Sequence, residues 1–220
     1  MNYLAIDTST MISTVTIGDD KEILGEFNVN QSKTHSESLV PMIETLLDLL
    51  GMTIRDIDKF IIAQGPGSFT GLRIGMTVAK TLAQVEKKDL ITISTLRAMA
   101  AGSTSEKAKL TLIDARSTRV YGALYDSNLE EIIPENLYEI DDLAKMVNEK
   151  NLEIEMIGLL NDKYFDKFEK AEKAPINLNN CIGRSLIRLC QEDKPEAKAL
   201  YEISPNYLRK SQAERELDKK

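Results

Sequence analysis

The stretch GPGSFTGLRIG at residues 65–75 joins a Gly-Pro-Gly turn to a helix that carries small residues at four-residue spacing. Gly71, Gly75, Ala79 and Ala83 share one face of that helix, because positions four apart stand nearly above one another. Each glycine inside a helix costs roughly 1 kcal/mol relative to alanine, so packing or function must compensate. The spacing leaves two interpretations open: a tight contact with the protein's own sheet or helix, or a docking surface for a second chain.

This stretch lies inside a predicted strand-helix-strand unit. A short buried strand at 60–63 precedes it, a helix is predicted over 69–85, and a further strand follows at 90–93. Parallel strands joined by a helix place functional loops at the strands' carboxyl ends. The loop at 64–68 occupies that position.

The preceding part of the chain predicts three strands and a helix. The strands span residues 3–7, 12–17 and 22–29, with a hairpin turn at 18–21. The helix is predicted over 35–50, capped by Thr34 and ended by Gly51. Its apolar stripe is wider than one buried face requires, so we expect part of it to meet a partner. The stripe consists of Leu39, Met42, Ile43, Leu46, Leu47, Leu49 and Leu50.

A small, polar segment at 100–109 is the candidate boundary between two lobes. We expect residues 1–100 to form an N-terminal lobe with the docking helices, and residues 101–220 a smaller lobe with a charged tail. Strands are predicted at 110–113, 119–125 and 154–157, and helices at 140–149, 164–172 and 178–191. The tail after Arg209 has no assigned role.

Composition limits the function classes. The chain has 220 residues, is 42% apolar and carries a net charge of -7, so we expect a real core and no nucleic-acid contact through a basic surface of its own. It has no long apolar run and no signal peptide, which predicts a cytoplasmic protein away from membranes. The single histidine, His35, and the lack of a CxxC pair predict no ordinary zinc site. A carboxylate magnesium site is left open.

Two aspartates that end predicted strands carry the strongest chemical suggestion, Asp7 in AIDTST and Asp114 in LIDARS. The pair resembles the actin, Hsp70 and sugar kinase superfamily, in which two strand-Asp-turn-strand hairpins face each other across nucleotide phosphates. In that plan an Asp holds hydrated magnesium and the turn residues approach phosphate. Asp7, Thr8, Ser9 and Arg116 are the candidate nucleotide or anion contacts. Arg116 stands where the superfamily has glycine, and each aspartate could instead simply cap a turn.

Other catalytic interpretations fail on spacing. The glycine stretch is neither a Walker A loop nor a G-x-G-x-x-G motif. His35 and Ser36 are helix neighbours that do not face each other, and Ser68 lies outside a G-x-S-x-G elbow. We expect His35 to be a polar residue of the first helical turn and the chain to carry no catalytic residue. An anion at the helix start after Ser68 remains a weak suggestion.

Several motifs together resemble one family: AIDTST, THSESLVPMI, GPGSFTGLRIG, ISTL, IDAR followed by VY, and PNYLR. This combination is similar to the bacterial TsaB (YeaZ) family and extends over residues 3–209. The resemblance implies an α/β, actin-like (ASKHA, ribonuclease H-like) fold of two lobes with a truncated second lobe. It also implies a role in forming threonylcarbamoyladenosine beside the tRNA anticodon.

The resemblance further implies a noncatalytic subunit. TsaD would transfer the threonylcarbamoyl group, this chain would dock to TsaD through its first two long helices, and the ATPase TsaE would join them. The same surface would form a homodimer without TsaD, and tRNA would be reached only through the complex. No intrinsic cofactor is expected, and ATP or ADP with magnesium is a candidate at the interface of the complex. The expected interface residues are Leu39, Met42, Ile43, Leu46, Gly71, Leu72, Gly75, Met76, Ala79 and Ala83.

Two rival functions belong to other classes. An independent actin-fold ATPase or small-molecule kinase would need two intact phosphate hairpins, and a protease would need a nucleophile and base pair or a metal pair. For the docking hypothesis, Gly75→Leu or Ala79→Glu is expected to weaken association with TsaD while leaving the monomer folded. Arg116→Ala is expected to lower the activity of the complex more than its assembly.

Overall fold

The structure is a computed structural model that describes residues 1–30, 35–180 and 183–208. Within those ranges the strands form two five-stranded sheets. The first sheet has the order β3-β2-β1-β4-β5, from β1 (Tyr3–Asp7), β2 (Ile12–Gly18), β3 (Ile23–Asn30), β4 (Lys59–Gly65) and β5 (Asp89–Ser94). The second has the order β10-β9-β6-β7-β8, from β6 (Ala108–Asp114), β7 (Arg119–Tyr125), β8 (Glu131–Glu139), β9 (Ile154–Ile157) and β10 (Ala171–Lys173).

The two sheets share one topology. In each, the first three strands form an antiparallel meander, and the next two add in parallel beside the first strand of the meander. The predicted strand-Asp-turn-strand hairpins are therefore confirmed as secondary structure: β1 and β2 flank the first Asp turn, and β6 and β7 flank the second. The carboxyl ends of β1 and β6 carry Asp7 and Asp114 at equivalent positions.

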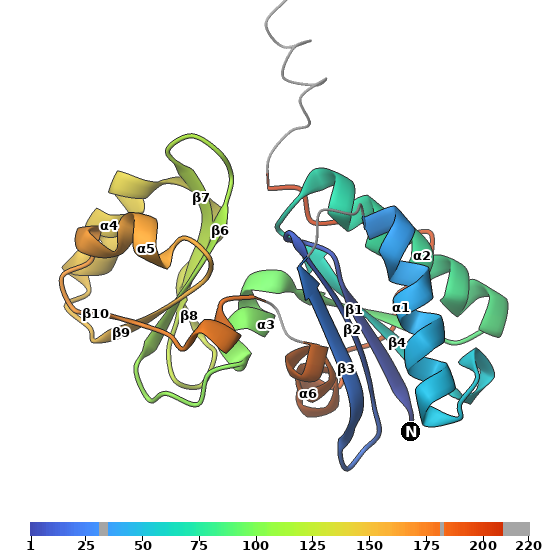
Figure 1. Cartoon of the computed structure of the whole chain (residues 1–220). Helices are drawn as coiled ribbons and strands as arrows, with labels where there is room; N and C mark the ends of the chain where they lie inside the picture. Colours follow the sequence, from blue (N-terminus) through green and yellow to red (C-terminus); the bar gives the residue numbers. More distant parts are fainter. Residues whose placement is uncertain (31–34, 181–182, 209–220) are drawn as a thin grey trace, which may run out of the picture.

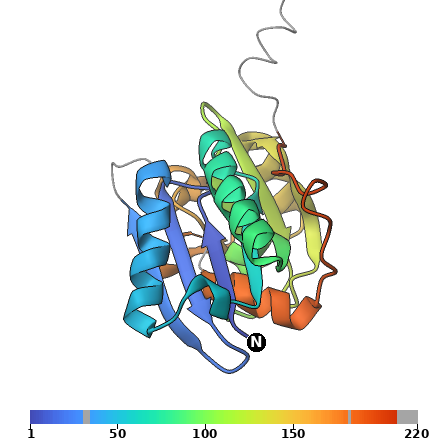
Figure 2. The same ribbon diagram turned by 90° about the vertical axis from the view of Figure 1, so that its right-hand side faces the viewer.

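Helices cover the sheets in layers (Figures 1 and 2). Helices α1 (His35–Leu50) and α2 (Phe69–Glu86) lie on the outer face of the first sheet, and α4 (Ile140–Glu149) covers the outer face of the second. Between the sheets lie α3 (Thr95–Ala101) and α6 (Gly183–Asp193), and the short α5 is Asn161–Tyr164. Short 3-10 helices occupy Ile54–Asp56, Phe165–Lys167 and Ile176–Leu178.

Strand β1 shows how the alternation of side chains builds these layers. Leu4 and Ile6 enter the core beneath α1 and α2, whereas Tyr3 and Ala5 enter the core shared by α3, α6 and the second sheet. Successive side chains of a strand point to opposite faces, so a strand buried on both sides is apolar throughout most of its length. Helix α6, the last of the described helices, packs against β1, β2 and β4, so this later part of the chain returns to the first sheet.

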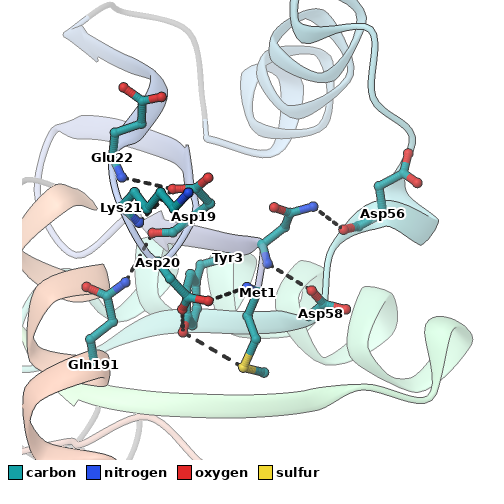
Figure 3. A network of polar contacts seen from close by, with 10 residues as sticks. Met1, Tyr3, Asp19, Asp20, Lys21, Glu22, Asp56, Asp58 and Gln191 are labelled. Atoms are coloured by element: carbon teal, nitrogen blue, oxygen red, sulfur yellow. Dashed lines mark hydrogen bonds and ion pairs between the residues drawn. The ribbon is translucent and has the colours of Figure 1, made fainter.

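The amino terminus is fixed beside this helix (Figure 3). The Met1 amino group pairs with Asp20, and the Tyr3 hydroxyl donates to the same carboxylate over 2.7 Å. Burial and this hydrogen bond raise the pKa of Tyr3 to about 12. Gln191 of α6 donates to the Asp19 carbonyl, and the Asp19 backbone N–H closes the predicted hairpin turn by donating to Glu22. The contacts tie α6 to the β2–β3 turn.

Three sequence predictions of local structure need correction. The segment 164–172, expected as a helix, contains the end of α5, a 3-10 turn and the start of β10 instead. Helix α6 begins at Gly183 rather than at 178, and β8 and α3 were not predicted. The predicted cap at Thr34 and the tail after Arg209 lie outside the described residues.

The described helices include none that combines the length and apolar character required to cross a membrane. The proposed lobe boundary near residue 100 stays a prediction. Its polar segment 102–107 connects α3, which packs between the sheets, to β6.

Candidate functional site

The small-residue face of α2 packs against the chain's own first strand and the turn that follows it. A Cβ atom added to Gly71 would lie 2.0 Å from the carbonyl oxygen of Thr8, and one added to Gly75 would lie 2.2 Å from the Thr8 hydroxyl. The Thr8 hydroxyl also donates to the Gly71 carbonyl over 2.8 Å. The glycine spacing therefore serves a close helix-to-turn contact inside the monomer.

The other residues expected at a partner interface share this location. All ten are buried within the described chain, where they pack beneath α1 and α2 against β1, β2 and β4. The set is Leu39, Met42, Ile43, Leu46, Gly71, Leu72, Gly75, Met76, Ala79 and Ala83. The expectation of a side-chain-poor docking groove on this face is corrected, because the chain fills the groove with its own residues. The first of the two open interpretations of the spacing is the correct one.

Asp7 lies under the same contact, at the carboxyl end of β1. Its side chain is 1% exposed, and Oδ1 accepts a hydrogen bond from the backbone N–H of Ser9 over 2.8 Å. The other oxygen, Oδ2, has no hydrogen-bond partner among the described residues. Burial raises the pKa of Asp7 to about 6, and the hydrogen bonds from Ser9 and Thr8 oppose that rise. The carboxyl group caps its own turn and points away from solvent.

The turn after Asp7 is covered by the glycine loop. The backbone N–H of Ser68 donates to the Ser9 carbonyl over 2.6 Å, and a Cβ added to Gly67 would lie 2.3 Å from that carbonyl. Gly65 can begin this loop because its φ of +111° suits glycine and few other residues. The Ser9 hydroxyl is fully buried beside the Asp7 carboxyl group, and it favours the charged form and so lowers the pKa of Asp7.

The equivalent turn of the second sheet is open. Asp114 is exposed, and its Oδ1 accepts a hydrogen bond from the backbone N–H of Arg116 over 2.9 Å. Arg116 and Ser117 have φ values of +68° and +64°, in the left-handed region that favours glycine. Arg116 thus stands where the superfamily has glycine, and its backbone adopts the conformation that a glycine would favour there.

His35 holds the first turn in place. Its Nδ1 lies 2.6 Å from the Ser13 hydroxyl and its Nε2 lies 2.9 Å from the Thr10 carbonyl. His35 is thus the polar residue of the first turn of α1 that the sequence predicted, and it also connects the start of α1 to the β1–β2 hairpin. Both ring nitrogens are engaged with these groups, an arrangement typical of a structural histidine.

A cleft of about 760 Å³ separates the two Asp turns. Its first wall comes from the β1–β2 turn, the glycine loop and the start of α2, and its second wall from the end of β6 and the β6–β7 turn. Asp114 is the one carboxylate among the described lining residues, and Arg73 and Arg116 are their two cations. Aromatic and aliphatic lining is supplied by Phe69, Tyr121, Tyr207, Met11, Met99, Leu112, Leu159 and Leu160.

Asn206 and Tyr207, from the segment before Arg209, also line this cleft. Lys80 of α2 donates to the Ile203 carbonyl, and Gln64 exchanges hydrogen bonds with Ser204 and Asn206. Tyr207 then stacks on Phe69 with ring centroids 4.6 Å apart. In the sequence, PNYLR was only a motif shared with a family. Its spacing could not show that this segment contacts α2.

Arg73 is the site residue that sequence analysis missed. Its guanidinium lies 3.9 Å from the centre of the Phe69 ring, and its Nε donates to the Tyr207 hydroxyl over 3.0 Å. Stacking on an aromatic face fixes the orientation of a guanidinium while leaving its outer N–H groups available. The signal was the i, i+4 spacing of Phe69 and Arg73, which places the two side chains on one face of a helix.

The cleft does not fit a magnesium nucleotide held in the expected superfamily manner. Both turn aspartates accept hydrogen bonds from N–H groups of their own turns, the Thr8 hydroxyl is occupied by Gly71, and the Arg116 side chain stands at the glycine position. No group of three or more His, Cys, Asp or Glu side chains suited to a metal ion occurs among the described residues.

Comparison with known proteins identifies the family. A family model described as TsaD, tRNA N6-adenosine threonylcarbamoyltransferase, matches residues 22–217. The chain belongs to the TsaD family. Within that family it is similar to the tRNA threonylcarbamoyladenosine biosynthesis protein TsaB of Bacillus subtilis, with 29% identity over 97% of this chain and 96% of the relative. It is also 36% identical to TsaB of Escherichia coli over 57% of this chain, an alignment that spans about half of that relative (55%).

Solved structures agree with this assignment at the level of the fold. YeaZ from Pseudomonas aeruginosa superposes with a TM-score of 0.80 at 22% identity, over 94% of this chain and 99% of that one. A Bacteroides thetaiotaomicron protein with an actin-like ATPase fold superposes with a TM-score of 0.50 at 12% identity, over 86% and 96% of the two chains. The chain is thus of the TsaB (YeaZ) type within the TsaD family, and its fold is the expected actin-like α/β fold.

Proposed function

We propose that this chain is a noncatalytic platform subunit in tRNA threonylcarbamoyladenosine biosynthesis. The family and the TsaB relatives support the process, because both carry it in their names. In this proposal TsaD performs the transfer of the threonylcarbamoyl group, TsaE joins the assembly, and tRNA is reached through the complex. ATP or ADP with magnesium belongs to the interface of that complex rather than to the cleft of this chain.

The observation that carries the docking part is an apolar groove on α1 and α2. The groove measures about 490 Å³ and is lined by residues of α1, of α2 and of the segment 52–54 that follows α1. Val40 on its rim is 43% exposed, and Val78 and Leu82 of α2 are half-buried. Exposed apolar side chains gathered over two helices favour a protein partner. We therefore place the interface at this groove, which includes Ile43 but none of the other nine residues expected at an interface from the sequence.

The charge of the chain supports a protein partner as the route to tRNA. A net charge of -7 is unfavourable for direct binding of a polyanion. A surface of apolar residues with few cations suits TsaD instead, and in its absence a second copy of this chain. The lining contains the carboxylates of Glu44 and Asp48 beside its apolar side chains.

Two substitutions test the docking surface. Val40→Glu and Val78→Glu each place a carboxylate in the groove, and we expect each to weaken capture of purified TsaD by about tenfold or more, because a buried, unpaired charge is costly. Leu49→Glu is the matched control: Leu49 is 71% exposed on the same helix and lies outside the groove lining. Equal capture of TsaD by all three variants would contradict the docking surface. In the absence of TsaD, Val40→Glu and Val78→Glu should be monomeric, whereas Leu49→Glu should associate as the unaltered chain does.

Reconstitution tests the platform role. Threonylcarbamoyladenosine formation on tRNA is measured with TsaD and TsaE, in the presence and absence of this chain, and the chain alone is assayed for ATP hydrolysis. We expect modification to require the chain and the isolated chain to hydrolyse no ATP above background. Steady ATP turnover by the isolated chain would favour the rival actin-fold ATPase or kinase.

A further inference from the structure

Helix α3 connects the two sheets, and polar side chains of the second sheet hold the chain at both ends of this helix. The helix lies between the sheets (Figure 1), where it packs against β4 and β5 of the first and against β6 and β7 of the second. It follows Ser94, the last residue of β5, and it leads through residues 102–107 into β6. Its two ends are therefore the places where a relative movement of the sheets would be felt.

At the start of α3, Glu135 binds Ser94. The Ser94 hydroxyl donates to Glu135 Oε1, and the Tyr125 hydroxyl donates to the same oxygen over 2.5 Å. Ser94 belongs to the first sheet, whereas Tyr125 and Glu135 belong to β7 and β8 of the second, so one carboxylate joins the two sheets directly. Ser94 also caps α3, because its Oγ accepts a hydrogen bond from the Arg97 backbone N–H over 3.2 Å. Moving the sheets apart would break the bond to Glu135 and disturb this cap.

An irregularity in β8 accompanies the contact made by Glu135. From Gly122 to Leu124 the strand β7 advances by two positions, whereas the paired residues 133–136 of β8 advance by three. Such a bulge changes the direction of the side chains in it. Burial raises the pKa of Glu135, while the hydrogen bonds from Ser94 and Tyr125 lower it. A carboxylate removed from water depends on its donors, so separation from Ser94 would be costly.

The exit from α3 is held by two further buried side chains of the second sheet. Ser103 is 6% exposed, and its hydroxyl donates to Glu155 of β9, which is also 6% exposed. Lys109 of β6 is 1% exposed, and its Nζ donates to the Ser105 carbonyl over 2.8 Å. Glu155 and Lys109 are paired in register on neighbouring strands, so their opposite charges stabilise each other. The polar segment predicted as a lobe boundary is therefore fixed by these two charged groups.

We propose that these groups form an interlobe clamp, which holds the two lobes in one arrangement when neither a ligand nor a partner is bound. The clamp consists of Ser94, Ser103, Lys109, Tyr125, Glu135 and Glu155. Hinges are built from residues that absorb backbone changes easily, whereas a movement here would leave buried carboxylates without donors. Helix α3 is also joined to the first lobe, because Arg97 pairs with Asp193 of α6, which packs on the first sheet. This inference goes beyond the platform proposal and does not depend on it.

The experiment measures the separation of the lobes in the full chain with two nitroxide spin labels and pulsed electron paramagnetic resonance. Met11→Cys and Leu159→Cys carry the labels, because these side chains are 67% and 56% exposed and line the cleft from different lobes. Both native cysteines are replaced by alanine in this labelled parent chain. We expect the parent to give one narrow distance distribution. Glu135→Ala should roughly double its width, since the lobes can shift once Ser94 has lost its acceptor.

Further variants separate the clamp from a general loss of charge or stability. Glu135→Gln keeps an oxygen acceptor in place, so it should retain the narrow distribution. Glu131→Ala is the matched control, because Glu131 is an exposed glutamate of the same strand that takes no part in the clamp. Ser103→Ala tests the other end of α3 independently and should broaden the distribution, whereas Thr104→Ala, at its exposed neighbour, should not. Circular dichroism verifies that each variant is folded before its distances are measured.

Three outcomes would overturn the inference. The first is a parent chain whose distance distribution is already broad. The second is an unchanged width in both Glu135→Ala and Ser103→Ala, which would show that packing alone fixes the lobes. The third is an equal broadening in Glu131→Ala, since the effect would then reflect the charge of β8. TsaD is absent from all of these measurements, so the interlobe clamp and the platform proposal fail separately.

Discussion

The two Asp turns occupy equivalent places in sheets of the same topology, yet one is buried and the other is open. Asp7 is 1% exposed beneath α2, whereas Asp114 faces the cleft as an exposed residue. The difference arises after the strands that pair in parallel with the Asp-bearing strands: β4 beside β1 in the first sheet, and β9 beside β6 in the second. A glycine with positive φ follows in both lobes, Gly65 at +111° and Gly158 at +137°. In the first lobe an 18-residue helix follows, and in the second only the four residues of α5.

The comparison shows that the helix packed over each turn, and not the strand-turn-strand motif itself, decides whether the turn is buried or accessible. Helix α2 uses its glycine face to press on Thr8 and seals the first turn, whereas the second turn has only a short helix nearby and stays accessible with Arg116 at its apex. One lobe thus contributes a rigid floor to the cleft and the other contributes a charged, open wall. Substitutions at the buried first turn and at the open second turn should therefore change the stability of the chain by different amounts.

The largest effect is expected from filling the glycine face of α2. In Gly71→Ala the new methyl group would lie 2.0 Å from the Thr8 carbonyl oxygen, so the helix must move away from β1. We expect a loss of about 3 kcal/mol or more in the free energy of unfolding. Gly75→Leu should be at least as disruptive, which reverses the earlier expectation that its monomer stays folded. Urea denaturation measures both.

Gly51→Ala is the control for this substitution. Gly51 has a φ of +64° but no atom within 4 Å of an added Cβ, so only the backbone conformation is penalised. We expect a loss of about 1 kcal/mol. Comparable losses for Gly51→Ala and Gly71→Ala would show that the close contact with Thr8 contributes little.

A smaller effect should follow from neutralising Asp7. In the folded chain its pKa is raised from 3.8 to about 6, so the folded state keeps the proton through a pH range in which the unfolded chain has lost it. Stability therefore falls as the pH rises from about 4 to 6 and stays lower above that range, by roughly 3 kcal/mol at most. Asp7→Asn should flatten this slope. Unfolding free energies measured from pH 4 to pH 8 check the prediction.

The second-lobe partner Asp114→Asn is the control for charge removal. Its side chain is exposed, so we expect a change within about 0.5 kcal/mol at pH 7. A pH slope that persists unaltered in Asp7→Asn would assign it to another group and would weaken the contrast between the buried and the open turn.

The smallest effect is expected at the open turn itself. Arg116→Gly removes the cost of holding an L-residue at a φ of +68°, and we expect a gain of about 0.5 kcal/mol in stability after the greater flexibility of glycine in the unfolded chain is included. Thr118→Gly, in the same turn without a left-handed φ, should lose stability instead. Thermal unfolding compares the two variants, and a loss in both would contradict a glycine-type turn at Arg116.

Local patterns in the sequence predicted much of the fold. The strands of the first sheet, helices α1 and α2 and the repeated strand-Asp-turn-strand units were all recognisable, because alternation, helical periodicity and turn residues are local signals. The segment 164–172 was misassigned because its apolar residues suit a short helical turn followed by an edge strand as well as a continuous helix. Helix α3 was missed because its short, alanine-rich sequence TLRAMAA runs directly into the small, polar segment that follows and resembles it in composition.

The sequence by itself determined that something approaches α2 closely and that two aspartates end equivalent strands. The small-residue spacing and the strand patterns are properties of consecutive residues and need no knowledge of the fold. Only the tertiary structure decided that Thr8 fills the glycine face, that Tyr207 returns to orient Arg73, and that α1 and α2 line an apolar groove together with residues 52–54. Those outcomes depend on contacts between residues far apart in the chain, and spacing along a helix cannot specify which distant segment comes to lie against it.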